Sequence, residues 1–208
     1  MKPSKKKPRE VIESFYCSNN TENALDYQIL GWESEEAQRR RFKVLTDNIN
    51  LDGKSLLDVG CGLGNLLSYF KEVGIQCKYT GADILESMTK AAGERNPDGE
   101  FLYVDVFNSE NFSDRKFDVV FTSGIFNLSL DNNMKFLEKA IKRFMELANQ
   151  QVMFNLLHIR STDKGSGFFY YNPEKVMTIL HKLHIGAERI KLIDDYLPND
   201  FSVIINMQ

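Results

Sequence analysis

Residues 56–64 read LLDVGCGLG, an apolar run that reaches the acid Asp58 and continues with glycine at every second position, at Gly60, Gly62 and Gly64. Glycine adopts positive φ and has no Cβ, so such a loop can turn sharply and let a ligand approach the main chain. A helix beginning near Gly64 would offer unpaired N–H groups at its positive end. The stretch therefore predicts a buried strand, a tight loop and a helix, with a ligand site at the loop.

From residue 54 onward, short apolar runs alternate with amphipathic stretches. Candidate strands are residues 54–60, 76–82, 100–104, 117–122 and 150–156. They are continuously hydrophobic, which is typical of a parallel sheet covered on both faces. Apolar residues at helical spacing predict helices after Leu63, from Met134 to Ala148, and from Asn172, where a capping residue precedes a proline. This alternation predicts a doubly wound, mostly parallel α/β sheet with helices on both faces.

The two ends of the chain depart from this alternation. Candidate strands 188–193 and 201–206 are separated by seven residues, too few for a crossover helix, so an antiparallel pair at one edge of the sheet is expected. With these two strands the sheet has seven. Near the N-terminus, Ser34 is expected to cap a helix, whereas the stretch before it is ambiguous. We expect one compact domain, in which residues 1–50 form a helical extension or lid and residues 51–208 form the sheet domain.

Charge and cysteine content exclude several classes of protein. With 26 basic and 29 acidic residues the net charge is −3, which does not attract nucleic acid. The basic residues from Lys2 to Arg9 are interpreted as a solvated tail, and Arg39, Arg40 and Arg41 as part of an exposed helix face. Three cysteines without Cys-x-x-Cys spacing argue against a disulfide framework or a zinc site and fit a reducing cytoplasm. Neither a secretory signal nor a run of roughly 18 apolar residues that could span a membrane is expected.

Glycine spacing separates the ligands that such a loop could bind. A P-loop requires a lysine and a hydroxyl residue after its last glycine, and neither follows Gly64. The dinucleotide fingerprint Gly-x-Gly-x-x-Gly, counted from Gly60, requires glycine where the chain has Asn65. What remains is Gly60-x-Gly62-x-Gly64 after Asp58. This pattern resembles the first motif of the class I S-adenosylmethionine-dependent methyltransferases.

The resemblance to this family continues downstream in the expected order. Asp83 ends the second strand, where the family has an acid that accepts hydrogen bonds from both ribose hydroxyls. Asp105 follows the third strand, at the position that contacts the exocyclic amine of adenine, with Val106 as its neighbour. Ser123 and Gly124 end the fourth strand and match the residues that border the methionine part of the cofactor.

The resemblance spans roughly residues 54–156 and implies S-adenosylmethionine as the cofactor and methyl transfer as the activity. The cofactor-binding residues that it implies are Asp58, Gly60, Cys61, Gly62, Gly64, Asn65, Asp83, Ile84, Asp105, Val106, Ser123 and Gly124. The antiparallel pair agrees with the family's seventh strand, which is inserted beside the sixth. The segment GWESEEAQRRRF is similar to a helix that often covers the cofactor in small bacterial members.

Several candidate residues keep a structural alternative. The glycine loop could be a turn without a ligand, and Asp83 and Asp105 could be turn or cap acids. His158, after the fifth strand, is a candidate general base, with a polar loop residue as the alternative. His181 and His184 are one helical turn apart, but no acidic or cysteine ligand set accompanies them. They are interpreted as solvated helix residues, and no metal is expected.

The sequence does not identify the methyl acceptor or the oligomeric state. The aromatic run 168–171 could form a substrate wall or pack in the core. A small-molecule acceptor is slightly favoured over a protein side chain, and a nucleic acid is not expected. Alignment with an activated cofactor can supply roughly 7–11 kcal/mol, so an acceptor that is already nucleophilic requires no catalytic residue, and His158 is the one candidate. The alternatives are an NAD-dependent oxidoreductase with a Rossmann fold and a non-catalytic S-adenosylmethionine-binding protein.

Overall fold

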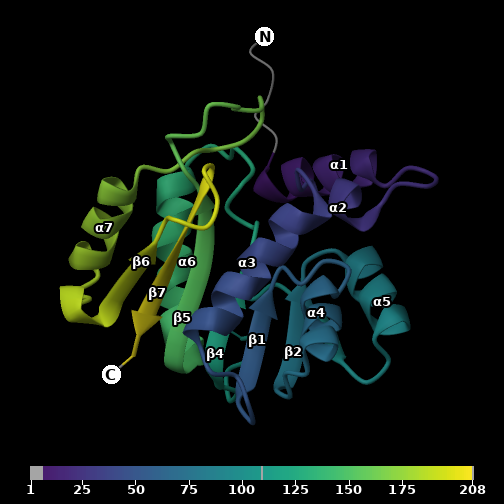
Figure 1. Ribbon diagram of the computed structural model, residues 1–208, viewed down its shortest axis with the longest axis horizontal. Coiled ribbons are helices and arrows are strands. Elements are labelled where there is room, and N and C mark those ends of the chain that lie inside the picture. The colour runs from purple at the N-terminus through teal and green to yellow at the C-terminus, as the bar shows by residue number, and fades with distance from the viewer. Residues whose placement is uncertain (1–6, 109, 208) are drawn as a thin grey trace.

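The computed structural model describes residues 7–108 and 110–207, and its centre is a seven-stranded sheet of order β3-β2-β1-β4-β5-β7-β6 (Figure 1). The strands are β1 (Ser55–Val59), β2 (Lys78–Asp83), β3 (Glu100–Tyr103), β4 (Phe117–Thr122), β5 (Ala148–Leu157), β6 (Ile190–Ile193) and β7 (Asp200–Asn206). Strands β1 to β5 pair in parallel, whereas β7 is antiparallel to both β5 and β6. The predicted sheet, with its antiparallel pair at one edge, is confirmed. Observed strand ends differ from the predicted ones by two residues or fewer.

Helices cover both faces of the sheet. They are α1 (Pro8–Asn19), α2 (Asp26–Ile29), α3 (Glu35–Asn48), α4 (Asn65–Val73), α5 (Glu86–Arg95), α6 (Asn133–Leu147), α7 (Pro173–Lys182) and the short 3-10 helix η1 (Ala187–Arg189). Successive strand residues face opposite helix layers. Leu56 packs in the cluster that contains Phe42 of α3 and Phe70 of α4, whereas Leu57 packs in the cluster that contains Ile141 of α6. This alternation explains why the strands are apolar throughout.

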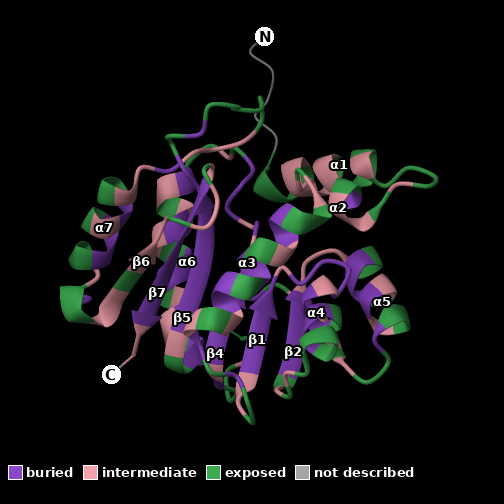
Figure 2. Cartoon of the chain, viewed as in Figure 1, coloured by how far each residue is buried: buried purple, intermediate pink, exposed green. Residues whose placement is uncertain are grey.

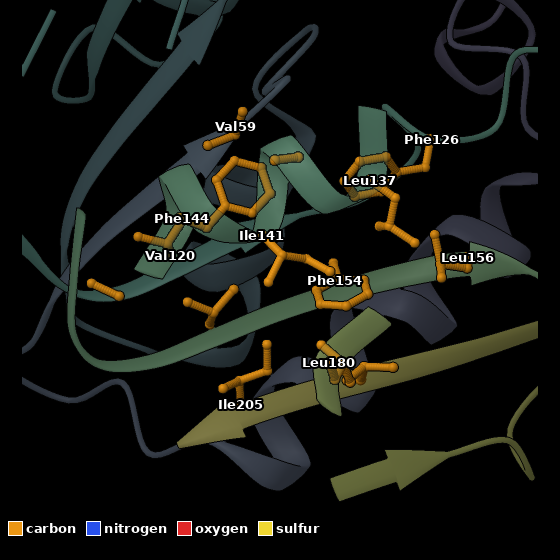
Figure 3. Packing of buried hydrophobic residues seen from close by; sticks show 14 of the residues in the cluster. Val59, Val120, Phe126, Leu137, Ile141, Phe144, Phe154, Leu156, Leu180 and Ile205 are labelled. Carbon is orange, nitrogen blue, oxygen red and sulfur yellow. The ribbon is translucent and has the colours of Figure 1, made fainter. Parts of the chain in front are cut away.

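The views of the molecule agree with this layering. Figure 2 shows the central strands buried along most of their length, while the helices expose their outward sides. Figure 3 shows the α6 layer, where Ile141 and Phe144 of α6 and Leu180 of α7 point toward Phe154 of β5 and its neighbours. The core therefore consists of two layers of side chains, one on each face of the β-sheet. Neither layer fills the space at the carboxyl ends of β1, β2 and β4, where a site can form.

Local capping fixes where the helices begin. The Ser34 hydroxyl accepts a hydrogen bond from the N–H of Ala37 (3.1 Å), which starts α3 as predicted. Asn172 accepts from the N–H of Glu174 (2.8 Å) and starts α7. Gly64 is the N-terminal cap residue of α4 and has a left-handed conformation, with φ of 78°. Helices α3 and α7 thus begin at side-chain caps, and α4 begins at a glycine.

The N-terminal segment is more ordered than the sequence pattern predicts. Helices α1 and α2 were not predicted, and Figure 1 shows them above the carboxyl ends of β1 and β2. Arg9 is exposed, as the interpretation of Lys2 to Arg9 as a solvated tail predicts, but it lies in α1 and contacts Glu13 (2.8 Å) and the Tyr103 hydroxyl (3.0 Å), so it is not part of a tail. Residues 2–6 of that stretch lie outside the described residues. The tail prediction fails at Arg9 because its side chain is held by Glu13, one helical turn later, and by Tyr103 at the end of β3.

Arg41 also corrects the sequence interpretation. Arg39 and Arg40 lie at the surface, but Arg41 is 3% exposed and pairs with Asp200 of β7, which is 0% exposed. Its guanidinium also donates to the carbonyl oxygen of Ala37 (2.6 Å). The expected exposed face therefore ends at Arg40, because Arg41 lies on the inward side of α3 with Phe42.

Other sequence expectations concern cysteines, membranes and metals. Cys17, Cys61 and Cys77 are all free, and the expected cytoplasmic location stays a prediction. Among residues 7–108 and 110–207, no helix combines the length and the apolar character needed to cross a membrane. Within the same part of the chain, no three His, Cys, Asp or Glu side chains are grouped to hold a metal ion.

Candidate functional site

The loop between β1 and α4 turns as its glycines predict. Gly60, Gly62 and Gly64 have φ values of 76°, 53° and 78°, which residues with a Cβ rarely adopt. The N–H groups of Gly60 and Cys61 donate to the carbonyl oxygen of Ala82, at 2.7 and 3.2 Å. These bonds hold the loop at the carboxyl ends of β1 and β2, next to the point between β1 and β4 where the chain order reverses.

Side chains of the N-terminal segment cover this loop. A Cβ built on Gly62 would lie 2.7 Å from Cδ2 of Leu30. A Cβ built on Gly124, which has φ of 98°, would lie 2.9 Å from Cη2 of Trp32. Glycine at these positions therefore makes room for the cover as well as for the turn. A ligand that lies on the loop has to share this space with Leu30 and Trp32 or displace them.

A cavity lies between the glycine loop and this cover. Its wall combines main-chain groups of the glycine loop, polar side chains and apolar side chains, the composition typical of small-molecule and cofactor sites. The predicted residues in its wall are Asp58, Gly60, Cys61, Gly62, Asn65, Asp83, Ile84, Val106, Ser123 and Gly124. Its N-terminal wall residues Trp32, Gln38 and Phe42 belong to the segment GWESEEAQRRRF, which resembles a cofactor-covering helix, whereas sequence reasoning missed Ile12, Tyr16 and Leu30. We name it the glycine-loop cavity.

Three predicted residues lie outside the wall of this cavity. Gly64 caps α4. Asp105 is exposed, and its carboxylate accepts from the N–H of Phe107 (2.9 Å), as a turn acid does. His158 is buried, its Nδ1 accepts from the N–H of Arg160 (2.9 Å), and burial together with Arg160 lowers its pKa. The functional roles of these three residues stay predictions.

Asp83 ties the glycine loop to the end of β2. One carboxylate oxygen accepts from the N–H of Gly62 (3.0 Å), and the other accepts from the N–H of Leu85 (2.9 Å). Burial raises the pKa of Asp83, although these main-chain hydrogen bonds act in the opposite direction. Each carboxylate oxygen has a further lone pair, so Asp83 can still accept hydrogen bonds from a ligand in the cavity.

Asp58 is the second acid in the cavity wall. It is buried at 4% exposure, and the Tyr79 hydroxyl donates to its Oδ2 (2.7 Å). Burial raises the pKa of Asp58 to about 7; the Tyr79 hydrogen bond lowers it, and the nearby Asp83 carboxylate raises it. Strongly perturbed acids of this kind concentrate at functional sites. A positively charged ligand group near Asp58 would favour its ionised form.

Two further polar contacts complete the wall. The Ser123 hydroxyl is buried and has no hydrogen-bond partner among the described residues. The amide of Asn65 donates to Oε1 of Gln38 (3.2 Å) and links the start of α4 to α3. The cavity therefore combines two acids, main-chain groups and an unused hydroxyl with apolar walls, an arrangement that fits an elongated ligand with several polar groups.

The aromatic run 168–171 and the two histidines His181 and His184 are the remaining candidates. Tyr171 is in the core, where its hydroxyl donates to the carbonyl oxygen of Phe126 (3.1 Å), whereas Phe168 and Tyr170 line a second cavity. The aromatic run thus contains both core and wall residues. His181 and His184 are both exposed, as predicted, but only His181 is a helix residue, because α7 ends at Lys182 and His184 has a positive φ of 59°.

Two comparisons with known sequences both find methyltransferases. A family model described as a methyltransferase domain matches residues 56–150, which include the glycine loop, Asp83 and Ser123. A protein of Mycobacterium tuberculosis (strain ATCC 25618 / H37Rv), whose name assigns it provisionally to the methyltransferases, is 25% identical over 163 residues. The match covers 74% of this chain and 93% of the relative.

Solved structures show a similar fold. The magnesium protoporphyrin IX methyltransferase of Synechocystis PCC 6803, solved with bound S-adenosylmethionine, has a TM-score of 0.68 at 14% identity over 98% of both chains. An S-adenosylmethionine-dependent methyltransferase of Archaeoglobus fulgidus has a TM-score of 0.61 at 17% identity over 86% of this chain and 97% of its own. At these identities the likeness concerns the fold.

Proposed function

We propose that this chain is an S-adenosylmethionine-dependent methyltransferase that methylates a small molecule and holds the cofactor in the glycine-loop cavity; the family model, the related sequence and the class I fold support this. One observation carries the assignment of the site. The glycine loop, Asp58 and Asp83 line a single cavity at the point where the order of the strands reverses.

The residues in the cavity wall fit the cofactor. Asp83 would accept hydrogen bonds from the ribose hydroxyls, while its bonds to Gly62 and Leu85 hold the carboxylate in place. Asp58 would attract the amino group of the methionine part, and the unpartnered Ser123 hydroxyl would bind its polar end. When bound, the cofactor supplies a methyl carbon activated by the sulfonium. The protein contributes by alignment and by excluding water.

We further propose that residues 1–50 act as the lid of this cavity. Tyr16 of α1 and Leu30 and Trp32, which follow α2, are part of its wall. Ion pairing between Asp26 and Arg95 of α5 fastens the segment to the sheet domain. Because Leu30 lies against Gly62 of the loop and Trp32 lies against Gly124 after β4, opening of this segment would admit the cofactor.

A small-molecule acceptor is favoured by the enclosure of the site. The N-terminal helices cover the carboxyl ends of the strands, and the net charge of −3 gives no basic platform for nucleic acid. A protein side chain on a mobile segment is the second candidate acceptor. An NAD-dependent oxidoreductase and a non-catalytic binding protein gain no support from the family model or from the similar structures.

Thermal unfolding with a panel of cofactors tests the proposal. S-adenosylmethionine and S-adenosylhomocysteine, each at 100 times its dissociation constant, should stabilise the protein by about 2.7 kcal/mol, or roughly 5–10 °C. NAD and NADP should produce no such shift. Stabilisation by NAD and none by S-adenosylmethionine would contradict the assignment.

Variants of Asp83 test where the cofactor binds. Asp83→Ala should weaken S-adenosylmethionine binding by about 1–3 kcal/mol in calorimetry, because charge-assisted hydrogen bonds are lost. Asp83→Asn retains one acceptor oxygen and should lose less. Asp114→Ala, a change at an exposed acid outside the cavity wall, is the control and should bind normally. Unchanged affinity in both Asp83 variants would remove Asp83 from the site.

A further inference from the structure

A second cavity lies beside the first. It measures about 1430 Å³ including the solvent at its mouth, and we name it the side cavity. Trp32 lines both cavities, while the neighbours Asn127 and Leu128 line one each. The Trp32 ring lies against Gly124, next to Ser123 at the end of β4. A molecule in the side cavity would therefore be adjacent to the part of the glycine-loop cavity proposed for the methionine part of the cofactor.

The cations of the side cavity are already engaged. Each arginine in its wall has an acidic partner: Arg40 has Glu36 (3.0 Å), Arg160 has Asp194 (3.1 Å), and Arg41 has Asp200. The nearby Lys164 is not part of the wall and lies over the Tyr170 ring at 5.7 Å. Within the described chain, the wall thus offers no unpaired cation to bind a carboxylate or a phosphate.

The charged groups left without an ion pair in this wall are acids. Glu33 and Asp163 line the cavity and have no ion pair among the described residues. Glu33 receives one long hydrogen bond, from Nδ2 of Asn199 (3.4 Å). Acids at the mouth of a cavity attract cations and disfavour anions.

Asn127 gives an independent sign of a ligand. It lines the side cavity, is 8% exposed, and its Oδ1 is buried without a hydrogen-bond partner. Leaving a buried acceptor unsatisfied is unfavourable, so such a group is normally paired with a ligand, water or protein donor. An N–H donor from a bound molecule would satisfy it.

Aromatic rings form another part of the wall of the side cavity. Trp32, Phe168 and Tyr170 line the cavity, and rings of this kind attract cations through their electron-rich faces. The protein itself shows this behaviour, because the Arg41 guanidinium lies 4.5 Å from the centroid of the Trp32 ring. Acids, an unpaired amide and aromatic faces together match a group that carries N–H bonds or positive charge.

We infer that the acceptor is a small amine bound in the side cavity, so that the enzyme methylates nitrogen; this inference rests on the proposed methyltransferase function. Glu33 and Asp163 attract the amine, the Trp32 and Phe168 rings hold its body, and Asn127 orients its nitrogen. The bound ammonium first loses a proton to solvent, and the unprotonated nitrogen then gives its lone pair to the methyl carbon. The N–C bond forms as the S–C bond breaks, sulfur keeps that electron pair, and the ammonium product releases a proton to solvent.

Matched probe molecules test the inference by binding and by turnover. Calorimetry in the presence of S-adenosylhomocysteine compares phenethylamine, 2-phenylethanol and phenylacetate, and a second set compares hexylamine, hexanol and hexanoate. In at least one set the amine should bind about tenfold more tightly than its alcohol and carboxylate. With methyl-labelled S-adenosylmethionine, that amine alone should gain the label.

Variants of the two acids test the mechanism of selection. The double variant Glu33→Gln and Asp163→Asn should weaken amine binding about five- to tenfold and leave S-adenosylhomocysteine binding unchanged. Both side chains are exposed and lack ion pairs within the described chain, so folding should be preserved. Asp52→Asn, in the turn before β1 at the opposite end of the sheet, is the matched control and should bind amines normally.

The outcomes separate this inference from the function on which it rests. Absence of S-adenosylmethionine binding would overturn the proposed function. Normal cofactor binding would overturn only the amine assignment if no amine binds more tightly than its alcohol and carboxylate in either set. An amine preference that is the same in the double variant would also overturn the role of Glu33 and Asp163.

Discussion

Replacing Asp58 with asparagine should stabilise the protein at alkaline pH. Asp58 is buried, and burial raises its pKa from 3.8 to about 7, with Asp83 adding to the rise and the Tyr79 hydrogen bond opposing it. An acid with a raised pKa binds its proton more tightly when folded, so stability is lost as pH rises from about 4 through about 7. At pH 8 this ionisation costs about 4 kcal/mol. Asparagine has the same shape, can accept the Tyr79 hydrogen bond and has no charge to bury.

Urea unfolding of both proteins at pH 5 and pH 8 measures the effect. At pH 5 the cost of Asp58 is about 1.5 kcal/mol, so the advantage of the variant should grow by about 3 kcal/mol between the two pH values. Asp200, whose pKa burial raises to about 6, titrates in the same range but is unchanged in the variant, so its contribution cancels. If the difference in unfolding free energy between the two proteins changes by less than about 1 kcal/mol between pH 5 and pH 8, the reasoning is refuted.

The Asp58→Asn variant should also bind the cofactor more weakly. If the ionised Asp58 attracts the amino group of S-adenosylmethionine, Asp58→Asn should lower affinity at pH 8 and have a smaller effect at pH 5, where Asp58 is mostly protonated. Calorimetry at the two pH values separates this role from a purely structural one. A stabilised variant with normal affinity at pH 8 would leave Asp58 without a role in binding.

The remaining predictions concern a buried ion pair and the glycines. Arg41→Met leaves the buried Asp200 without a counter-ion and should lower the unfolding free energy at pH 8 by about 3–5 kcal/mol in urea titration. The loss should be smaller at pH 5, where a pKa of about 6 allows Asp200 to be neutral; an equal loss would contradict this. Gly62→Ala, at φ of 53° with Leu30 2.7 Å from the added Cβ, should cost about 1–2 kcal/mol and weaken S-adenosylmethionine binding about tenfold. Gly74→Ala, at φ of 77° with no atom within 4 Å, is its control and should show the backbone cost without a change in calorimetric affinity.

The sheet was predictable because its strands are apolar on both faces and its glycine loop is unmistakable. Capping also marked α3 and α7 at Ser34 and Asn172. Helix α5 (Glu86–Arg95) was missed, because it buries few residues and its sequence ESMTKAAGER has little apolar periodicity. Helix α1 was missed because none of its residues is fully buried, so no apolar stripe marks it.

The site was predictable where it lies on the strands and less so where it depends on tertiary packing. Asp58, Asp83 and Ser123 follow from motif order, and the structure places all three in one wall. The contribution of Leu30 and Trp32 depends on how the N-terminal segment folds over the loop, which local pattern does not encode. Spacing could have found Arg41, because it lies one helical turn before Leu45, on the apolar side of α3.

A crystal structure of the protein with S-adenosylhomocysteine tests the central claim most directly. The account predicts the nucleoside in the glycine-loop cavity, with its ribose hydroxyls on Asp83 and its amino acid part near Asp58 and Ser123, and with Leu30 and Trp32 moved or repacked around it. Binding of the compound at another edge of the sheet, with Leu30 still seated on Gly62, would contradict it.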